Sequence, residues 1–94
     1  MPSAFVFVNC QFRFTTDVLE SLRKLRRVEQ AYNTYGMYDI VVKLRSENND
    51  DLRESIVRIR SIDGISSTFS MIILEEDEEE KNLQEKRKVQ SLAE

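Results

Sequence analysis

This chain of 94 residues has no histidine, one cysteine and two glycines. Without histidine it lacks the most common general base and metal ligand, and a Cys/His nucleophile pair is impossible. Its glycines, Gly36 and Gly64, do not form a phosphate-binding loop. Asp50 and Asp51 stand where a helix is expected to begin, so helix capping explains them better than catalysis does. We therefore expect no enzyme activity, no metal site and no cofactor.

Long apolar runs are also missing, so no membrane span is expected. Residues 1–8 lack the basic segment of a signal peptide, and the single cysteine, Cys10, cannot form an internal disulfide. Together these absences fit a cytoplasmic protein.

Charge is distributed unevenly along the chain. Residues 75–94 carry eight acidic and four basic residues, a net charge of −4, whereas residues 1–74 have a net charge of +1; together they give the −3 of the whole chain. The six consecutive acids at 75–80 repel one another and argue against packed structure. We therefore predict one folded domain over residues 1–74 and a flexible or helical acidic tail over residues 75–94. The basic cluster at 23–27 fits a helix C-terminus, so no direct nucleic-acid contact is expected.

Hydrophobic periodicity divides residues 1–74 into six elements. Apolar, β-branched and aromatic runs predict strands at 4–10, 28–35, 38–45 and 65–74, and helical spacing predicts helices at 15–25 and 48–59. Asp17 and Glu20 are placed as a capping box for the first helix. Gly36 and Met37 predict a tight hairpin between the second and third strands. In the last strand, four apolar residues are expected to share one face: Ile65, Phe69, Met71 and Ile73.

This order predicts an α+β, ferredoxin-like βαββαβ fold, with a four-stranded antiparallel sheet and both helices on one face. The predicted strands are nevertheless apolar on both faces: Val6 and Val8 alternate with Phe5 and Phe7. An uncovered apolar face would exceed the patch that a monomer usually exposes. We therefore predict a homodimer in which two sheets pack together as a dimeric α/β barrel.

The predicted hairpin carries the one group of residues in the sequence that could bind a small molecule. Its five residues combine two tyrosines and a carboxylate: Tyr35, Gly36, Met37, Tyr38 and Asp39. The aromatic rings offer stacking, and the carboxylate offers an acceptor for an ammonium group. An ordinary turn with amphipathic tyrosines explains the same residues equally well, so the residues alone leave both interpretations open.

Two motifs resemble the effector-binding (RAM) domain of Lrp/AsnC-type transcriptional regulators. They are Val28 followed by GMYDIVV at 36–42, and GISSTFSMIIL at 64–74. The family pattern is a valine that opens the second strand, then G-x-Y-D, and later G-V-x-x-T-x-T before the last apolar strand. This chain differs in having Tyr35 where the family has threonine, Ile65 for valine and Ser70 for the second threonine. It begins directly at the first strand, so we expect a stand-alone domain without the helix-turn-helix.

The resemblance implies dimers that pair through their sheets and assemble into octamers or decamers. It also implies an effector, typically an amino acid, in clefts between dimers near the hairpin and the last strand. Asp39 would bind the ammonium group of that effector, and hairpin N–H groups would hold its carboxylate. The residues expected to line this site are Tyr35, Gly36, Met37, Tyr38, Asp39, Thr68 and Ser70.

The leading hypothesis is therefore an amino-acid-binding module that modulates transcription indirectly, alone or together with full-length Lrp/AsnC-type regulators. The alternative is a structural adaptor subunit that has lost its ligand, with Tyr35 filling the pocket. A dimeric-barrel enzyme is disfavoured, since histidine and paired strand carboxylates are missing. ACT-type amino-acid-binding domains are disfavoured because residues 9–13 lack their glycine-containing turn.

Overall fold

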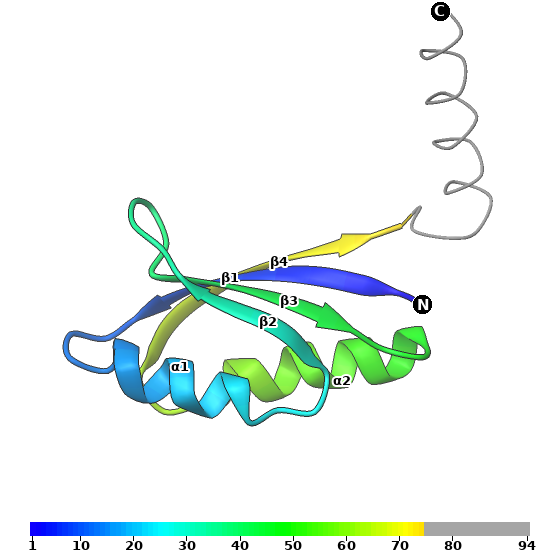
Figure 1. Ribbon diagram of the computed structural model, residues 1–94, viewed down its shortest axis with the longest axis horizontal. Helices are drawn as coiled ribbons and strands as arrows, with labels where there is room; N and C mark the ends of the chain where they lie inside the picture. The colour runs from blue at the N-terminus through cyan, green and yellow to red at the C-terminus, as the bar shows by residue number, and fades with distance from the viewer. Residues whose placement is uncertain (75–94) are drawn as a thin grey trace, which may run out of the picture.

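The computed structural model describes residues 1–74, and the predicted acidic tail at 75–94 lies outside the described residues. The predicted order of strands and helices is confirmed (Figure 1). The elements are β1 (Ser3–Cys10), α1 (Thr15–Arg23), β2 (Val28–Asn33), β3 (Ile40–Arg45), α2 (Asn49–Arg60) and β4 (Ile65–Ile73). No helix within residues 1–74 is long and apolar enough to cross a membrane.

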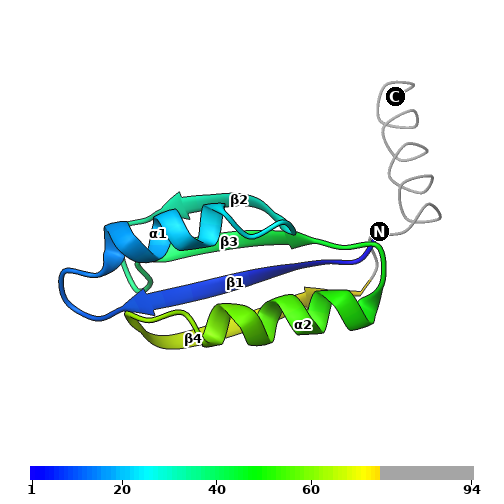
Figure 2. The same ribbon diagram turned by 90° about the horizontal axis from the view of Figure 1, so that it is seen from below.

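The four strands form one antiparallel sheet in the order β2-β3-β1-β4. Both helices cover the same face, with α1 over β2 and β3 and α2 over β1 and β4 (Figure 2). This is the predicted ferredoxin-like arrangement, in which right-handed crossovers bring both helices to one side. The opposite face of the sheet, here called the open face, has no covering element within residues 1–74.

The core lies between the sheet and the helices. On β1 and β3 every second side chain is fully buried, as strand geometry requires, and Leu22 of α1 and Ile59 of α2 are fully buried against them. Burial of each such aliphatic side chain contributes about 1.5–3 kcal/mol. The buried apolar residues are Ala4, Val6, Val8, Val18, Leu22, Ala31, Ile40, Val42, Leu44, Leu52, Ile56 and Ile59.

The two helices begin in different ways. Asn48 caps α2, because its side-chain oxygen accepts a hydrogen bond of 2.8 Å from the Asp51 N–H. The predicted capping box of α1 is wrong: the residue before that helix is Phe14, whose side chain makes no capping hydrogen bond. Since α1 begins at Thr15, Asp17 lies inside its first turn, where its charge complements the helix dipole.

The predicted two-residue hairpin is also wrong. β2 ends at Asn33 and β3 begins at Ile40, which leaves a loop over residues 34–39. The Thr34 N–H donates to the Asp39 carbonyl at 2.8 Å, and the Thr34 hydroxyl donates to the Tyr38 carbonyl at 2.7 Å. Gly36 has a φ of 131°, a conformation that glycine adopts without strain. The loop is therefore longer than predicted, with both ends held together.

A β-bulge changes the face of Ile65. Asn9 pairs with Ser67 but Cys10 pairs with Ile65, so Ser66 is an extra residue in β4. As a result Ile65 packs against the core, and the prediction that it shares a face with Phe69 is wrong. Phe69, Met71 and Ile73 pair with residues of β1 that lie on the open face, as predicted.

Candidate functional site

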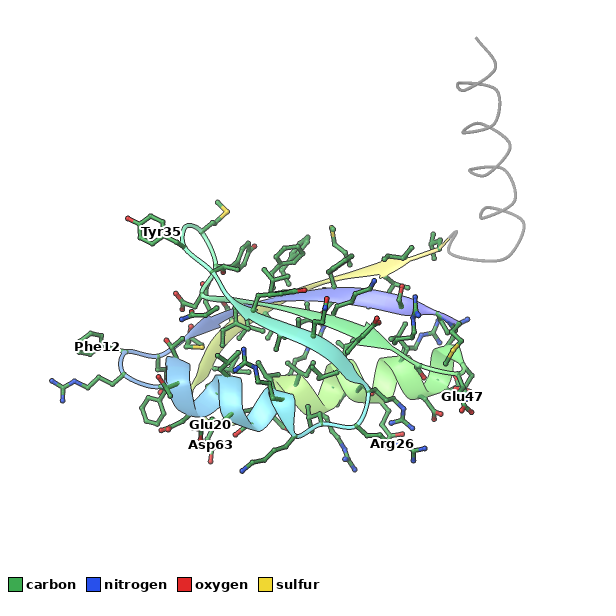
Figure 3. The ribbon with its side chains drawn as sticks, viewed as in Figure 1. Phe12, Glu20, Arg26, Tyr35, Glu47 and Asp63 are labelled. Carbon is green, nitrogen blue, oxygen red and sulfur yellow. The ribbon has the colours of Figure 1, made fainter. Side chains whose placement is uncertain are left out.

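The loop between β2 and β3, residues 34–39 and here called the hairpin loop, rises from the sheet on the side of the open face (Figure 1). Tyr35 at its tip is fully exposed and points away from the sheet (Figure 3). Met37 is 84% exposed. In the single chain Tyr35 therefore does not fill a pocket. The structural-adaptor alternative expected Tyr35 to fill one.

Asp39 at the base of the hairpin loop binds to its own chain. Its N–H donates to the Val8 carbonyl at 3.0 Å, and one carboxylate oxygen, Oδ2, accepts the Cys10 N–H at 2.8 Å. This pair of hydrogen bonds continues the β1–β3 ladder beyond Ile40. A ligand ammonium group at Asp39 would therefore share a carboxylate that already fixes the base of the loop.

The Cys10 thiol lies beside this carboxylate and is half-buried. Burial raises the pKa of Cys10 above its ordinary value of 9.0, and the negative charge of Asp39 raises it further, while a hydrogen bond with Thr15 lowers it. The thiol is therefore kept in its protonated form, which is the unreactive one.

An aromatic row leads from the hairpin loop across the open face. The Tyr38 ring lies 5.3 Å from the Phe7 ring, and the Phe7 ring lies 6.3 Å from the Phe69 ring, both in tilted geometry. Such ring pairs contribute about 0.5–1.5 kcal/mol beyond their buried area. The hairpin loop is thereby joined to β1 and β4 through side chains of the open face.

Thr68 and Ser70 lie on the other face of the sheet. They pair with Val8 and Val6, which are fully buried beneath the helices, so the side chains of β4 at these positions point toward the helix layer. The Ser70 hydroxyl is buried and has no hydrogen-bond partner within residues 1–74. Within one chain the sheet therefore separates the two predicted groups: Tyr35, Gly36, Met37, Tyr38 and Asp39 in the loop, and Thr68 and Ser70 in β4.

Two cavities lie at the end of the sheet remote from the hairpin loop, and sequence reasoning did not find them. One, of about 290 Å³, is polar and lined in part by arginines, of which Arg27 lies 3.3 Å from Asp51. The other, of about 400 Å³ and here called the end groove, is lined by Met1, Pro2, Glu47, Asn48, Asn49, Ile72, Ile73 and Leu74. Each draws on chain segments far apart in the sequence, so no local motif reveals it. Residues 1–74 contain no cluster of acidic or cysteine side chains that could hold a metal ion.

The open face is apolar on β1 and β4 and mixed on β3, where Val41 and Lys43 both face it. Its apolar half, on β1 and β4, carries Phe5, Phe7, Phe69, Met71 and Ile73, of which Phe69 is 54% and Met71 47% exposed. On β3, the Lys43 ammonium group lies over the Phe5 ring at 5.9 Å from its centroid. The face therefore offers aromatic and aliphatic surface bordered by cations.

Comparison with protein families matches residues 3–83 to the Lrp/AsnC ligand binding domain. The HTH-type transcriptional regulator FL11 of Pyrococcus horikoshii is 34% identical over 76 residues, which cover 81% of this chain and 50% of that protein. The chain thus spans about half the length of that curated relative. Further curated matches include other HTH-type regulators, and homocitrate synthases over 16% of their length.

Solved structures of similar size match along nearly their whole length. FFRP-DM1 is 32% identical with a TM-score of 0.75, and the match covers 79% of this chain and 100% of that one. The hypothetical protein PHS023 from Pyrococcus horikoshii is 35% identical with a TM-score of 0.74, covering 81% of this chain and 94% of that one. Chains consisting of this fold, with little else, are therefore found among its relatives.

Proposed function

Because the chain belongs to the Lrp/AsnC ligand-binding domain family, we propose that it is a regulatory module that oligomerises, binds an amino acid and modulates transcription indirectly. Its relatives include transcriptional regulators, which supports a regulatory role for this domain. The observation that carries the proposal is the hairpin loop, whose base is fixed by hydrogen bonds beside an apolar open face. The proposed module has no catalytic function, and its ordered unit is the proposed domain over residues 1–74.

The exposed apolar side chains of the open face support the proposed homodimer. Five large apolar side chains lie together on β1 and β4, and Phe69 and Met71 keep about half of their surface in water. Covering this patch with the same patch of a second copy removes apolar area from water on both chains at once. We propose that such dimers assemble further into octamers or decamers in the cytoplasm and mix there with full-length Lrp/AsnC-type regulators.

The effector site is proposed to lie between copies. Asp39 and the exposed backbone of the hairpin loop lie on the open side of one chain, whereas Thr68 and Ser70 face the helix layer. The Ser70 hydroxyl is buried within its own chain, so Thr68 is the accessible member of the second group. A small molecule that touches both groups would therefore use the hairpin loop of one copy and β4 of another, at Thr68. An amino acid suits this pairing, because a carboxylate can receive its ammonium group and N–H or hydroxyl groups can receive its carboxylate.

The test is a thermal-shift screen of the full chain against the standard free amino acids. A ligand present at about 100 times its dissociation constant adds about 2.7 kcal/mol of apparent stability. We expect one amino acid, or a few related ones, to raise the melting temperature in a concentration-dependent way. If none does, the chain is an adaptor without a ligand.

A matched pair of variants then tests the site. Asp39→Asn keeps an oxygen that can accept the Cys10 N–H but removes the charge, so the loop should stay in place while the response to the amino acid is lost. Asp63→Asn removes a carboxylate from the exposed turn before β4, on the helix side of the sheet and away from the tip of the hairpin loop, and should leave the response unchanged. An unaltered response in Asp39→Asn would remove Asp39 from the site.

A further inference from the structure

The loop between β1 and α1 carries an aromatic side chain that the core does not use. Phe12 is 86% exposed and points outward at one end of the molecule (Figure 3). The loop around it is fixed: the Gln11 N–H donates to the Gly64 carbonyl at 2.7 Å, and the Phe14 N–H donates to the Gln11 carbonyl at 3.0 Å. Phe14 packs so closely on Gly64 that a Cβ at Gly64 would lie 2.7 Å from the Phe14 Cβ. Phe12 is thus displayed from a loop that is hydrogen-bonded and closely packed.

The residue after Phe12 is held in an unfavourable conformation. Arg13 has a φ of 75°, and within residues 1–74 it is the one non-glycine residue with positive φ. Its guanidinium lies 5.5 Å from the centroid of the Phe12 ring, and its side chain is exposed. The backbone strain at Arg13 does not help the core, because the side chains of Phe12 and Arg13 are both exposed. Strain of this kind indicates that the pair has a function. We call Phe12 and Arg13 the loop knob.

The end groove lies at the opposite end of the sheet. Its walls come from the residues that precede β1, from the β3–α2 connection and from the end of β4. Ile72 is 42% and Leu74 88% exposed, so apolar surface is open to water there, and Glu47 adds a carboxylate at the rim. Figure 3 places Phe12 and Glu47 at opposite ends of the sheet. The register agrees, since β1 starts beside Arg45 and ends before the loop knob.

We propose that the loop knob of one copy inserts into the end groove of a neighbouring copy. The Phe12 ring would cover Ile72 and Leu74, and the Arg13 guanidinium would pair with the Glu47 carboxylate, so apolar surface meets apolar surface and opposite charges meet. Because knob and groove lie at opposite ends, the contact is heterologous and repeats from copy to copy. This inference rests on the proposed oligomeric function: sheet pairing makes dimers, and the knob-in-groove contact links dimers into larger assemblies.

Native mass spectrometry of the full chain tests this contact. The wild type should form assemblies larger than a dimer, and Phe12→Ser should reduce them to dimers, with at least a tenfold weaker association between dimers. Val57→Ser alters another solvent-facing apolar residue, on α2 and 60% exposed, and should leave the assembly unchanged. A dimeric wild type, or a Phe12→Ser assembly of wild-type size, would overturn the proposal. A Phe12→Ser assembly of wild-type size would also be the result if residues 75–94 of the same chain, and not Phe12 of a neighbour, filled the end groove.

Charge reversal separates a specific contact from a general loss of solubility. Arg13→Glu and Glu47→Arg should each weaken the larger assemblies, and the double variant should restore them, because the ion pair is re-formed with its signs exchanged. Failure of the double variant to recover any assembly, with thermal unfolding showing it folded, would contradict the pairing of Arg13 with Glu47. In all of these variants the sheet dimer should persist, so its loss would count against the proposed dimer and not against the knob.

Discussion

The helix-covered face of the sheet and its open face are both apolar, but they bury their side chains to different extents. Val6 and Val8 are fully buried beneath the helices, whereas Phe5 and Phe7, which alternate with them along β1, remain partly exposed. One face therefore completes its core within residues 1–74, whereas the apolar side chains of the other face have no covering element among those residues. Folding of this chain and its proposed assembly therefore depend on separate sets of residues.

The largest effect on stability should come from the helix-covered face. Leu22→Ala removes a fully buried side chain from the centre of the core and should lower the free energy of unfolding by about 2–5 kcal/mol. Chemical denaturation of the purified variant measures this loss. A change below about 1 kcal/mol would mean that α1 is not firmly packed on the sheet.

A charge on the open face should break assembly and spare the fold. Phe69→Lys places a cation in the proposed sheet-to-sheet contact, and loss of such a central aromatic residue typically costs 2 kcal/mol or more, about a 30-fold rise in the dissociation constant. Sedimentation equilibrium should show monomers with native circular dichroism. Val57→Lys, on the solvent side of α2, is the control that should stay assembled. Retention of the dimer by Phe69→Lys would remove the open face from the interface.

Ser46, which is buried, and Ser70, whose hydroxyl is buried, allow a finer test of the covered side. The Ser46 hydroxyl donates to the Asn48 carbonyl at 3.0 Å, whereas the buried Ser70 hydroxyl has no partner within residues 1–74. Ser46→Ala should therefore cost about 1 kcal/mol, while Ser70→Ala should be neutral or stabilising by up to about 1 kcal/mol. Urea titrations of both variants decide this. A clear loss of stability in Ser70→Ala would show that its hydroxyl has a partner in the assembled protein.

The smallest expected effect concerns Cys10, where β1 meets the base of the hairpin loop. Burial and Asp39 raise the pKa of its thiol in the folded protein above 9.0, so the folded state keeps its proton where the unfolded chain releases it. This contribution to stability is complete below about pH 9 and declines as the pH rises above that value. Melting temperatures from about pH 8 to pH 10 should fall more steeply for the wild type than for Cys10→Ser. Parallel curves would mean that the thiol does not contribute.

Much of this architecture is predictable from the sequence because it depends on local patterns. Alternation in residues 4–8 and 40–44, helical spacing of Leu52, Ile56 and Ile59, and the polar start at Asn48 each indicate an element whose packing follows. The bulge at Ser66 and the longer hairpin loop could not be predicted, because they depend on pairing across strands. Asp39, for example, is positioned by hydrogen bonds to Val8 and Cys10, residues distant in the sequence.

The candidate site was less predictable than the fold. The family motifs identify both Asp39 and Thr68. The face that Thr68 occupies is decided by the register of β4 against β1 and by the β-bulge, which depend on pairing within the sheet. The end groove is assembled from three chain segments, and Arg13 gives no sign in the sequence of its positive φ. Only the folded backbone brings these features into view.

The most direct test of the central claim is native mass spectrometry of the full chain, alone and with each amino acid that raises its melting temperature. We predict even-numbered assemblies whose mass increases by that of the bound amino acid, and loss of this increase in Asp39→Asn. A monomer, or an assembly that gains no mass from any standard amino acid, would contradict the account.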